Sequence, residues 1–228
     1  MDIEVPKRLI NKAVAQYAAE IKKKTEIPST RHKKIITISR QLGTGGRKIA
    51  EAVGARLGCT VWGKEILDVL ASQAGGEYTA RMFEALDENT QGVIDALVSD
   101  LFGQVAKHTY LHLLPKAIFV IAQNDAVIIG RGSHLLLPDS FRVRIKASFE
   151  TRVNNMMRFE HLDRKTAEQR IKENDRQREA FMKDLARKLN IKEYHDQFDL
   201  GINTDRFDIA EATEIIVHAF RIFQQTRT

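Results

Sequence analysis

The chain contains few cysteine, proline and tryptophan residues and no long apolar run. Cys59 is the only cysteine among 228 residues, so no disulfide can form within the chain. Its first residues, "MDIEVPKRLI", include acidic side chains and no apolar block of the signal-peptide type. No stretch approaches the roughly 20 apolar residues of a membrane helix, which excludes membrane-spanning classes of protein. These features predict a reducing, cytoplasmic location.

Positive charge is concentrated in two parts of the chain, whose net formal charge is +6. Residues 1–34 carry 9 basic and 4 acidic side chains, a net +5, and residues 152–188 carry 11 and 7, a net +4. The first region is either a solvated helix face or a contact for an acidic partner. Aromatic residues do not alternate with these charges, which disfavours binding of single-stranded nucleic acid.

An apolar stripe near the start predicts a helix over Pro6–Thr25. Its members recur at spacings of three and four residues: Leu9, Ile10, Ala13, Val14, Tyr17, Ala18 and Ile21. The polar segment "TEIPSTRHKK" that follows predicts a linker. Such a stripe must be covered, either by its own subunit or by a second one. We expect a homodimer in which each helix docks on the partner subunit, with docking on the same subunit as the alternative.

From residue 35 onwards, short apolar segments alternate with longer helical patterns. Strands are predicted at 35–39, 60–63, 126–130, 142–147 and 199–203. Helices are predicted at 46–57, 64–73, 79–101, 104–123, 149–160, 165–188 and 208–223. This alternation predicts a three-layer α/β fold with a parallel sheet. The 60 or more helical residues between the second and third strands predict an inserted subdomain.

A glycine-rich segment, Ser39–Lys48, links the first strand to the next helix. Gly43, Gly45 and Gly46 allow positive φ angles and close approach of the backbone to an anion. The following helix points its N-terminal N–H groups at the same place. The pattern therefore favours phosphate binding over its alternative, a turn that only packs the strand against the helix.

The usual phosphate-binding loop reads glycine, four residues, glycine, lysine and then serine or threonine. In an ungapped register, Arg40 stands at the first glycine, Gly45 at the second, Gly46 at the lysine and Arg47 at the hydroxyl residue. A slip of one residue would instead put Arg47 at the lysine and Lys48 at the hydroxyl residue. In both registers the loop lacks the lysine–hydroxyl pair but keeps cations close by.

Other residues of the loop can supply the missing groups. Arg40 and Arg47 can grip phosphate with two parallel hydrogen bonds, so we expect loss of either side chain to weaken ATP binding or turnover at least about tenfold. The hydroxyl group that usually binds magnesium has two candidate replacements, Ser39 and Thr44.

Several segments together resemble the cytidylate kinase-like family, a branch of the nucleoside monophosphate kinases with a divergent phosphate loop. They are "ISRQLGTGGRKIAEAVGARLG", "VIIGRGSHLLLPD", "RIKASFETRVNNMMR", "RIKENDRQREAF" and "FDLGINTDRFDIAEA". The resemblance runs from about Lys34 to Phe220. It implies a kinase-like domain at 34–228, and the N-terminal helix and linker at 1–33 fall outside the resemblance. This P-loop kinase fold would have five parallel strands, a monophosphate-binding insertion at about 64–123 and a lid at about 152–190.

The resemblance also implies a set of site residues and two cofactors, ATP and Mg²⁺. The catalytic residues would be Arg47, Arg131, Arg152 and Arg178. The ATP phosphates would be bound by Ser39, Arg40, Gly43, Thr44, Gly45, Gly46, Arg47 and Lys48. The lid would contribute Arg152, Arg158, Arg176 and Arg178, and the acceptor would be bound by Lys64 and Arg131.

The expected activity is phosphoryl transfer from ATP to a nucleoside monophosphate, with CMP as one candidate. Authentic cytidylate kinases carry Gly-Arg-Asp after the third strand, whereas this chain has Gly132 in place of the aspartate, which leaves the acceptor base open. The alternative is a regulatory nucleotide-binding protein with weak or no catalysis. No metal site built from protein side chains is expected, because His108 and His112 lack a third ligand.

Overall fold

The structure, a computed structural model, describes residues 33–72, 76–102 and 110–226, together with Ile10, Asn11, Lys12, Val14, Ala15, Tyr17 and Ile21. The chain divides into two compact units. The sheet unit comprises Ile36–Val61 and Val127–Thr228, and the helical unit comprises Met1–Ile35 and Trp62–Ala126.

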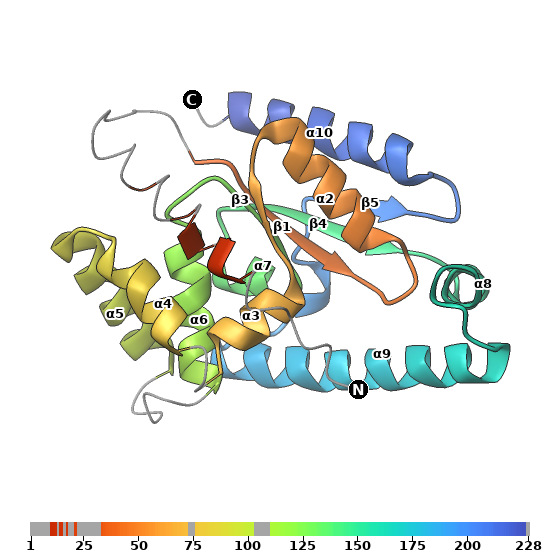
Figure 1. The fold of residues 1–228 in the computed structure, drawn as a ribbon, viewed down its shortest axis with the longest axis horizontal. Coiled ribbons are helices and arrows are strands. Elements are labelled where there is room, and N and C mark those ends of the chain that lie inside the picture. The colour runs from red at the N-terminus through yellow and green to blue at the C-terminus, as the bar shows by residue number, and fades with distance from the viewer. Residues whose placement is uncertain are drawn as a thin grey trace. The chain divides into compact units, whose positions relative to one another are not determined.

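The sheet has five strands in the order β2-β3-β1-β4-β5, with β1 in the centre (Figure 1). Their bounds are Ile35–Arg40 (β1), Thr60–Trp62 (β2), Ala126–Ile129 (β3), Phe141–Lys146 (β4) and Leu200–Asn203 (β5). Both β1 with β4 and β4 with β5 pair in parallel. The predicted α/β fold is confirmed, and each predicted strand agrees with the structure to within one residue at both ends.

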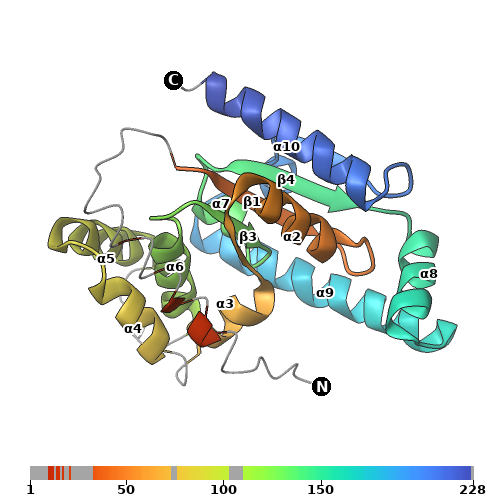
Figure 2. The ribbon, with the colours of Figure 1, turned by 45° about the horizontal axis from the view of Figure 1, so that its top comes forward.

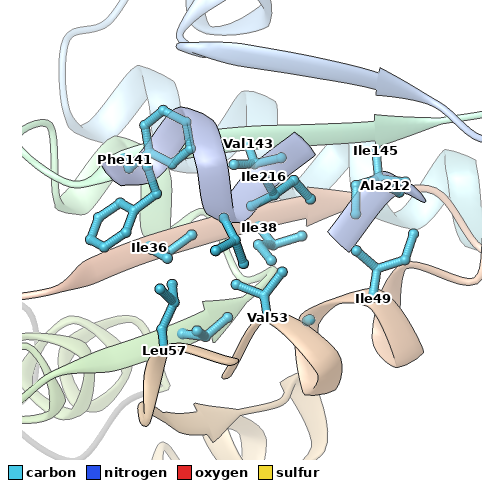
Figure 3. Close-up of a cluster of buried hydrophobic side chains, with 14 of the residues drawn as sticks. Ile36, Ile38, Ile49, Val53, Leu57, Phe141, Val143, Ile145, Ala212 and Ile216 are labelled. Carbon is cyan, nitrogen blue, oxygen red and sulfur yellow. The ribbon is translucent and has the colours of Figure 1, made fainter. Parts of the chain in front are cut away.

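One face of the sheet is covered by α2 (Gly46–Leu57) and α10 (Ile209–Gln225) (Figures 1 and 2). Alternate residues of β1 and β4 point to this face, because successive side chains of a strand leave it on opposite sides. Figure 3 shows Ile36 and Ile38 of β1 packed with Val53 of α2 and Ile216 of α10, all of them buried. This core fixes the start of α2 against the end of β1.

The other face is crossed by α9 (Arg164–Lys188), with α8 (Phe149–Glu160) beyond the end of β4 (Figures 1 and 2). A short helix that the sequence pattern did not predict, α7 (Ser133–Leu136), follows β3. The helices α8 and α9 share a small core of Val153, Met156, Ala167 and Ile171, and Leu42 of the glycine-rich loop packs against it. The predicted lid region is thus in direct contact with the loop.

The helical unit contains α3 (Lys64–Leu70), α4 (Gly76–Glu84), α5 (Glu88–Phe102) and α6 (Tyr110–Ile121). The single helix predicted over 79–101 is wrong, because the chain breaks between α4 and α5. Asp87 causes the break: its carboxylate accepts hydrogen bonds from the backbone N–H and the hydroxyl of Thr90 at 3.0 and 2.7 Å, which starts a new helix. Of the helix predicted over 104–123, residues 104–109 lie outside the described residues.

Three members of the N-terminal stripe that the structure describes are buried within their own unit. Ile10, Val14 and Tyr17 are helical and buried, and the Tyr17 hydroxyl donates a 2.8 Å hydrogen bond to the carbonyl oxygen of Val120. The Tyr17 ring also packs edge-on against Trp62, with 6.4 Å between the ring centroids. Docking on the same subunit is therefore the alternative that the structure supports, and the stripe no longer argues for a dimer. The rest of Pro6–Thr25 lies outside the described residues.

None of the described helices is both long and apolar enough to cross a membrane.

Candidate phosphate-binding site

Each glycine of the loop is required by a different feature of the local structure. Gly43 and Gly45 have φ angles of 85° and 73°, in the left-handed region that favours glycine. At Gly43 a Cβ would also lie 2.6 Å from the carbonyl oxygen of Arg152, so the loop touches the backbone of α8. Gly46 is the first residue of α2, where a Cβ would lie 2.8 Å from the Cβ of Arg40. These contacts hold the turn in one shape.

Side chains of α8 hold the loop by its carbonyl oxygens. The Arg152 Nε donates to the carbonyl oxygen of Leu42 at 2.7 Å, and the Asn155 side-chain amide donates to that of Gly43 at 2.8 Å. Arg152 is buried, and its other two guanidinium nitrogens donate to the carboxylate of Asp175 on α9. Helix α8 thus fixes the orientation of two successive peptide groups.

Two more carbonyl groups of the loop are held in the same way. The Arg178 Nη1 on α9 donates to the carbonyl oxygen of Arg40 at 2.7 Å. Within the loop, the buried Thr44 hydroxyl donates to the carbonyl oxygen of Gln41 at 2.8 Å. Four consecutive carbonyl oxygens, those of residues 40–43, therefore accept hydrogen bonds from side chains.

The orientation of these carbonyls determines the direction of the N–H groups. In a trans peptide the C=O and N–H point in opposite directions, so the N–H groups of residues 42–44 point away from the side chains that bind the carbonyls. Within the described part of the chain, no N–H of residues 42–46 has a hydrogen-bond acceptor. A run of such N–H groups at the start of a helix is the structure that binds phosphate in proteins.

Arginine side chains surround the loop with excess positive charge. The pKa of Arg178 is lowered to about 10, mainly by burial and in part by the nearby charges of Arg144, Arg152 and Arg40, while Asp175 opposes the shift. This value is still well above neutral pH, so the guanidinium of Arg178 stays charged. Among the described groups that shift this pKa, three arginines outnumber one carboxylate, and this excess of positive charge favours the binding of an anion of high charge.

Arg144 belongs to this cluster but was not among the residues proposed from the sequence. It is paired in register with Ser39 across β1 and β4, and its guanidinium lies 5.2 Å from the ring centroid of Phe198. In the segment "FRVRIK", Arg144 alternates with the buried Val143 and Ile145, so it faces the side of the sheet opposite the α2–α10 core. That alternation was the available signal: a charged residue near the carboxyl end of a central strand.

A buried histidine lies next to the arginines. His134 on α7 stacks on Phe198, with 4.5 Å between ring centroids. Its pKa is lowered to about 3, mainly by burial and further by Arg144, Arg142 and Arg178. His134 is therefore neutral at pH 7 and can offer one donor and one acceptor nitrogen.

The turn after β3 has an unusual backbone. Gly130, Arg131 and Gly132 have φ angles of 76°, 53° and 67°, three left-handed residues in succession. For a residue with a side chain this costs about 1–2 kcal/mol, and such strain tends to occur at functional sites. The Arg131 guanidinium lies 5.6 Å from the ring centroid of Phe181 on α9. At Gly132 a Cβ would meet the Leu185 side chain at 2.1 Å, so the replacement of aspartate by glycine fits the packing of α9 here.

Some expected site residues lie on the outer surface of their helices. The Arg47 side chain, 60% exposed, bonds to Glu51 on the same helix at 3.0 Å. Similarly, Arg176 is 76% exposed and bonds to Glu173 one turn away. Neither arginine is among the groups that shift the pKa of Arg178. Lys64 is the first residue of α3 in the helical unit.

Two further cations contact one exposed aromatic ring. Phe159 of α8 is 53% exposed, with the Lys48 Nζ at 4.6 Å and the Arg158 guanidinium at 5.1 Å from its ring centroid. Lys48 belongs to α2 and Arg158 to α8, so this contact joins the two helices beside the loop. The structure thus brings Lys48 and Arg158 together, and neither is among the groups that shift the pKa of Arg178.

Metal-binding side chains are scarce near the loop. Among the described residues there is no group of three or more His, Cys, Asp or Glu that could hold a metal ion. His108 lies outside the described residues, so the pair with His112 cannot be placed.

Comparison with solved structures finds one that shares the fold at low sequence identity and others with lower superposition scores. An uncharacterised protein from Eubacterium ventriosum superposes with a TM-score of 0.64 and 20% identity, over 84% of this chain and 99% of its own. Shikimate kinase from Bacteroides thetaiotaomicron has a TM-score of 0.46 and 13% identity, over 82% and 98% of the two chains. A gluconokinase from Sinorhizobium meliloti has a TM-score of 0.43 and 13% identity, over 86% and 96%. No curated protein matches the sequence.

The family model of the cytidylate kinase-like family matches residues 35–206. This is 172 of the 228 residues, and it includes the glycine-rich loop, the turn after β3 and both helices that hold the loop. The match covers the part of the chain that carries the arginine cluster. The chain therefore belongs to the cytidylate kinase-like family.

Proposed function

We propose that the protein transfers the γ-phosphoryl group of ATP to a nucleoside monophosphate, with CMP as one candidate acceptor. The observation that supports this most strongly is the cluster of Arg40, Arg144, Arg152 and Arg178 around the loop, with Asp175 as the carboxylate among them. Phosphoryl transfer needs little covalent chemistry from the protein. It depends on positioning and on positive charge near the transferred group.

The described residues divide this work among them. The N–H groups of residues 42–46 would hold the phosphates of ATP, because none of them has a hydrogen-bond acceptor among the described residues. Those of residues 42–44 also point away from the side chains that bind the loop carbonyls. Arg178 and Arg144 would stabilise the charge on the transferred phosphoryl group. Arg152 is a positioning residue, since its three nitrogens already bind Leu42 and Asp175. The acceptor phosphate would attack in line, without a covalent enzyme intermediate.

The role of Arg131 is carried over from the family resemblance, in which the arginine after the third strand holds the α-phosphate of the acceptor. Its strained backbone and the contact of its guanidinium with Phe181 are consistent with a side chain held in one orientation for binding. Residues with neighbouring positive φ angles also form a concave run of N–H groups that suits an anion.

Magnesium, which such kinases use, would supply charge neutralisation to the phosphates of ATP. The loop offers one hydroxyl group for it. The Thr44 hydroxyl is buried and donates to the carbonyl oxygen of Gln41, whereas the side-chain hydroxyl of Ser39, near the end of β1, makes no hydrogen bond to the described residues. A magnesium ion in this type of site keeps several waters and needs few protein ligands, so the Ser39 hydroxyl fits the role.

Coupled detection of ADP with a panel of nucleoside monophosphates tests the proposal. Wild-type protein should release ADP at a rate that depends on one of the acceptors, and Arg178→Gln should lower this rate at least about a hundredfold. Arg187→Gln is a matched control on the same helix, because Arg187 is 78% exposed and pairs with Asp184. No acceptor-dependent ADP from the wild-type protein would reject the proposal.

A second candidate is a regulatory nucleotide-binding protein without useful turnover. Two observations favour it: Arg152 and Arg178 already bind loop carbonyl groups, and Gly46 stands where the usual lysine would be. Binding of ATP at micromolar concentration with no acceptor-dependent ADP would select this candidate.

A further inference from the structure

Compared with the common loop, the positions of a glycine and of the basic residue are exchanged between 40 and 46. Relative to the common loop sequence, Arg40 stands where the first glycine is expected and Gly46 where the lysine is expected. A Cβ on Gly46 would lie 2.8 Å from the Cβ of Arg40 and 3.3 Å from both its Cγ and its Cδ. The stem of the Arg40 side chain therefore fills the space from which a lysine at 46 would start.

The direction of the Arg40 side chain follows from strand geometry. Ile36 and Ile38 point into the core between the sheet and α2, and Arg40 is the next residue of the same parity (Figure 3). Its side chain therefore leaves β1 on the side of α2 and passes over the first turn of that helix. This is the turn whose N–H groups form the candidate phosphate site.

The charge of Arg40 also lies at the site. Arg40 is one of the three arginines that lower the pKa of Arg178, and Arg178 in turn donates to the Arg40 carbonyl. By contrast, the Arg47 side chain is exposed and bonds to Glu51 further along α2. Of the two arginines that could replace the lysine, Arg40 is the one that lies with the cluster.

We propose that Arg40 does the work of the missing phosphate-loop lysine, and that Gly46 is glycine because the Arg40 stem occupies the lysine's space. The guanidinium would bind the β- and γ-phosphates of the donor nucleotide. It would enter the site from the end of β1 rather than from the start of α2. This inference rests on the proposed function for the identity of the donor, ATP.

Charge and packing at Arg40 can be tested separately by nucleotide binding. Arg40→Gln keeps most of the side-chain stem and removes the charge, so its unfolding midpoint should match the wild type. Its affinity for ATP with magnesium should fall at least about tenfold, equal to about 1.4 kcal/mol. Its affinity for AMP should change less than threefold, because AMP lacks the β- and γ-phosphates. Arg40→Lys should stay within about threefold of the wild type for ATP.

Two other variants give the comparison its controls. Arg56→Gln lies in the last turn of α2, where Arg56 pairs with Glu214 on the surface, and it should bind ATP as the wild type does. Arg47→Gln represents the competing explanation, in which the charge comes from the start of α2. If Arg47→Gln lowers the affinity for ATP as much as Arg40→Gln does, or more, the inference is overturned.

The exchange itself can be tested by a double-mutant cycle. Gly46→Lys alone should weaken ATP binding at least tenfold, because its Cβ meets the Arg40 stem. Arg40→Gly alone should weaken it by a similar factor, because the charge is lost. The double variant Arg40→Gly/Gly46→Lys restores the common arrangement, so it should bind ATP within about fivefold of the wild type.

The possible results separate this inference from the proposed function. Wild-type ATP affinity in Arg40→Gln, or a double variant as weak as the product of its two single losses, would overturn the role of Arg40. Absence of turnover in the wild type would reject the proposed kinase activity. The ATP affinities would still decide the role of Arg40, because they need no turnover.

Discussion

Arg152 and Asp175 join α8 to α9 through a bidentate ion pair, in which Nη1 donates to Oδ2 at 2.9 Å and Nη2 donates to Oδ1 at 2.8 Å. The third nitrogen of Arg152 binds the carbonyl oxygen of Leu42. The ion pair between the two helices therefore also sets the position of the glycine-rich loop.

Asp175→Asn should destabilise the fold by about 2 kcal/mol in urea unfolding, since it leaves a buried arginine without its carboxylate. The loss should fall below the 3–5 kcal/mol, roughly, of a fully buried pair, because the Asp175 side chain is 37% exposed. Glu173→Gln is the matched control, because its pair with Arg176 lies on the surface of the same helix, and its loss should lower the unfolding free energy much less. Equal losses in both variants would show that the Arg152 pair has no special role.

Strand positions could be predicted from the sequence because each strand is a short apolar segment between turn signals. The strand β3 is a continuous apolar run, and four consecutive residues of β1, Ile36–Ser39, are buried, as expected for strands covered on both faces. The break before α5 could not be predicted from apolar periodicity, since α4 and α5 continue the same helical pattern. Asp87 three residues before Thr90 was the signal that distinguished them.

The loop itself could be located from its glycines and from the strand and helix around it. The origin of its positive charge could not, because that depends on side-chain direction across the sheet. Arg144 comes from β4, far along the chain from the loop, and reaches the cluster through its register with Ser39. Arg47, although adjacent to the loop in sequence, points along the surface of α2. Proximity in sequence was therefore a weak guide to which arginines share the site.

Gly43→Ala should disrupt the loop more than an equal change at another left-handed glycine. Gly58→Ala is the control, because Gly58 has a φ of 68° but a Cβ there would meet nothing within 4 Å. Its cost should be about 1–2 kcal/mol of unfolding free energy, from backbone strain alone. Gly43→Ala adds a contact of 2.6 Å with the Arg152 carbonyl, so it should cost more and should also weaken ATP binding. Gly58→Ala should leave ATP binding unchanged, and a similar loss of binding in both variants would contradict the assigned geometry.

His134 should make the protein less stable as the pH falls below about 6.5. Its folded-state pKa is lowered to about 3, mainly by burial, so between these values the unfolded state binds the additional proton. The contribution is fully present above pH 6.5 and is lost on acidification, by about 2 kcal/mol between pH 6.5 and 5.

Urea unfolding of His134→Gln at pH 7 and pH 5 isolates this effect. The wild type should lose about 2 kcal/mol more than the variant between the two pH values. An identical pH dependence in both proteins would mean that His134 titrates normally in the folded state.

Packing of the N-terminal stripe within its own chain predicts stability that does not depend on protein concentration. Tyr17→Phe should lower the unfolding free energy by about 1 kcal/mol, since it removes the hydrogen bond to Val120. The thermal midpoint of the wild type should stay constant over a hundredfold range of concentration. A midpoint that rises with concentration would instead support docking of the stripe on a second subunit.

Phosphorus-31 NMR of a mixture of the protein, ATP, magnesium and one nucleoside monophosphate tests the central claim most directly. The spectrum shows which molecule receives the phosphoryl group that ATP loses. With at least one of AMP, CMP, GMP and UMP, the account predicts that ADP and the diphosphate of the acceptor appear in equal amounts. No inorganic phosphate should accumulate during this time. Unchanged ATP with all four acceptors, or ADP formed together with inorganic phosphate alone, would contradict the account.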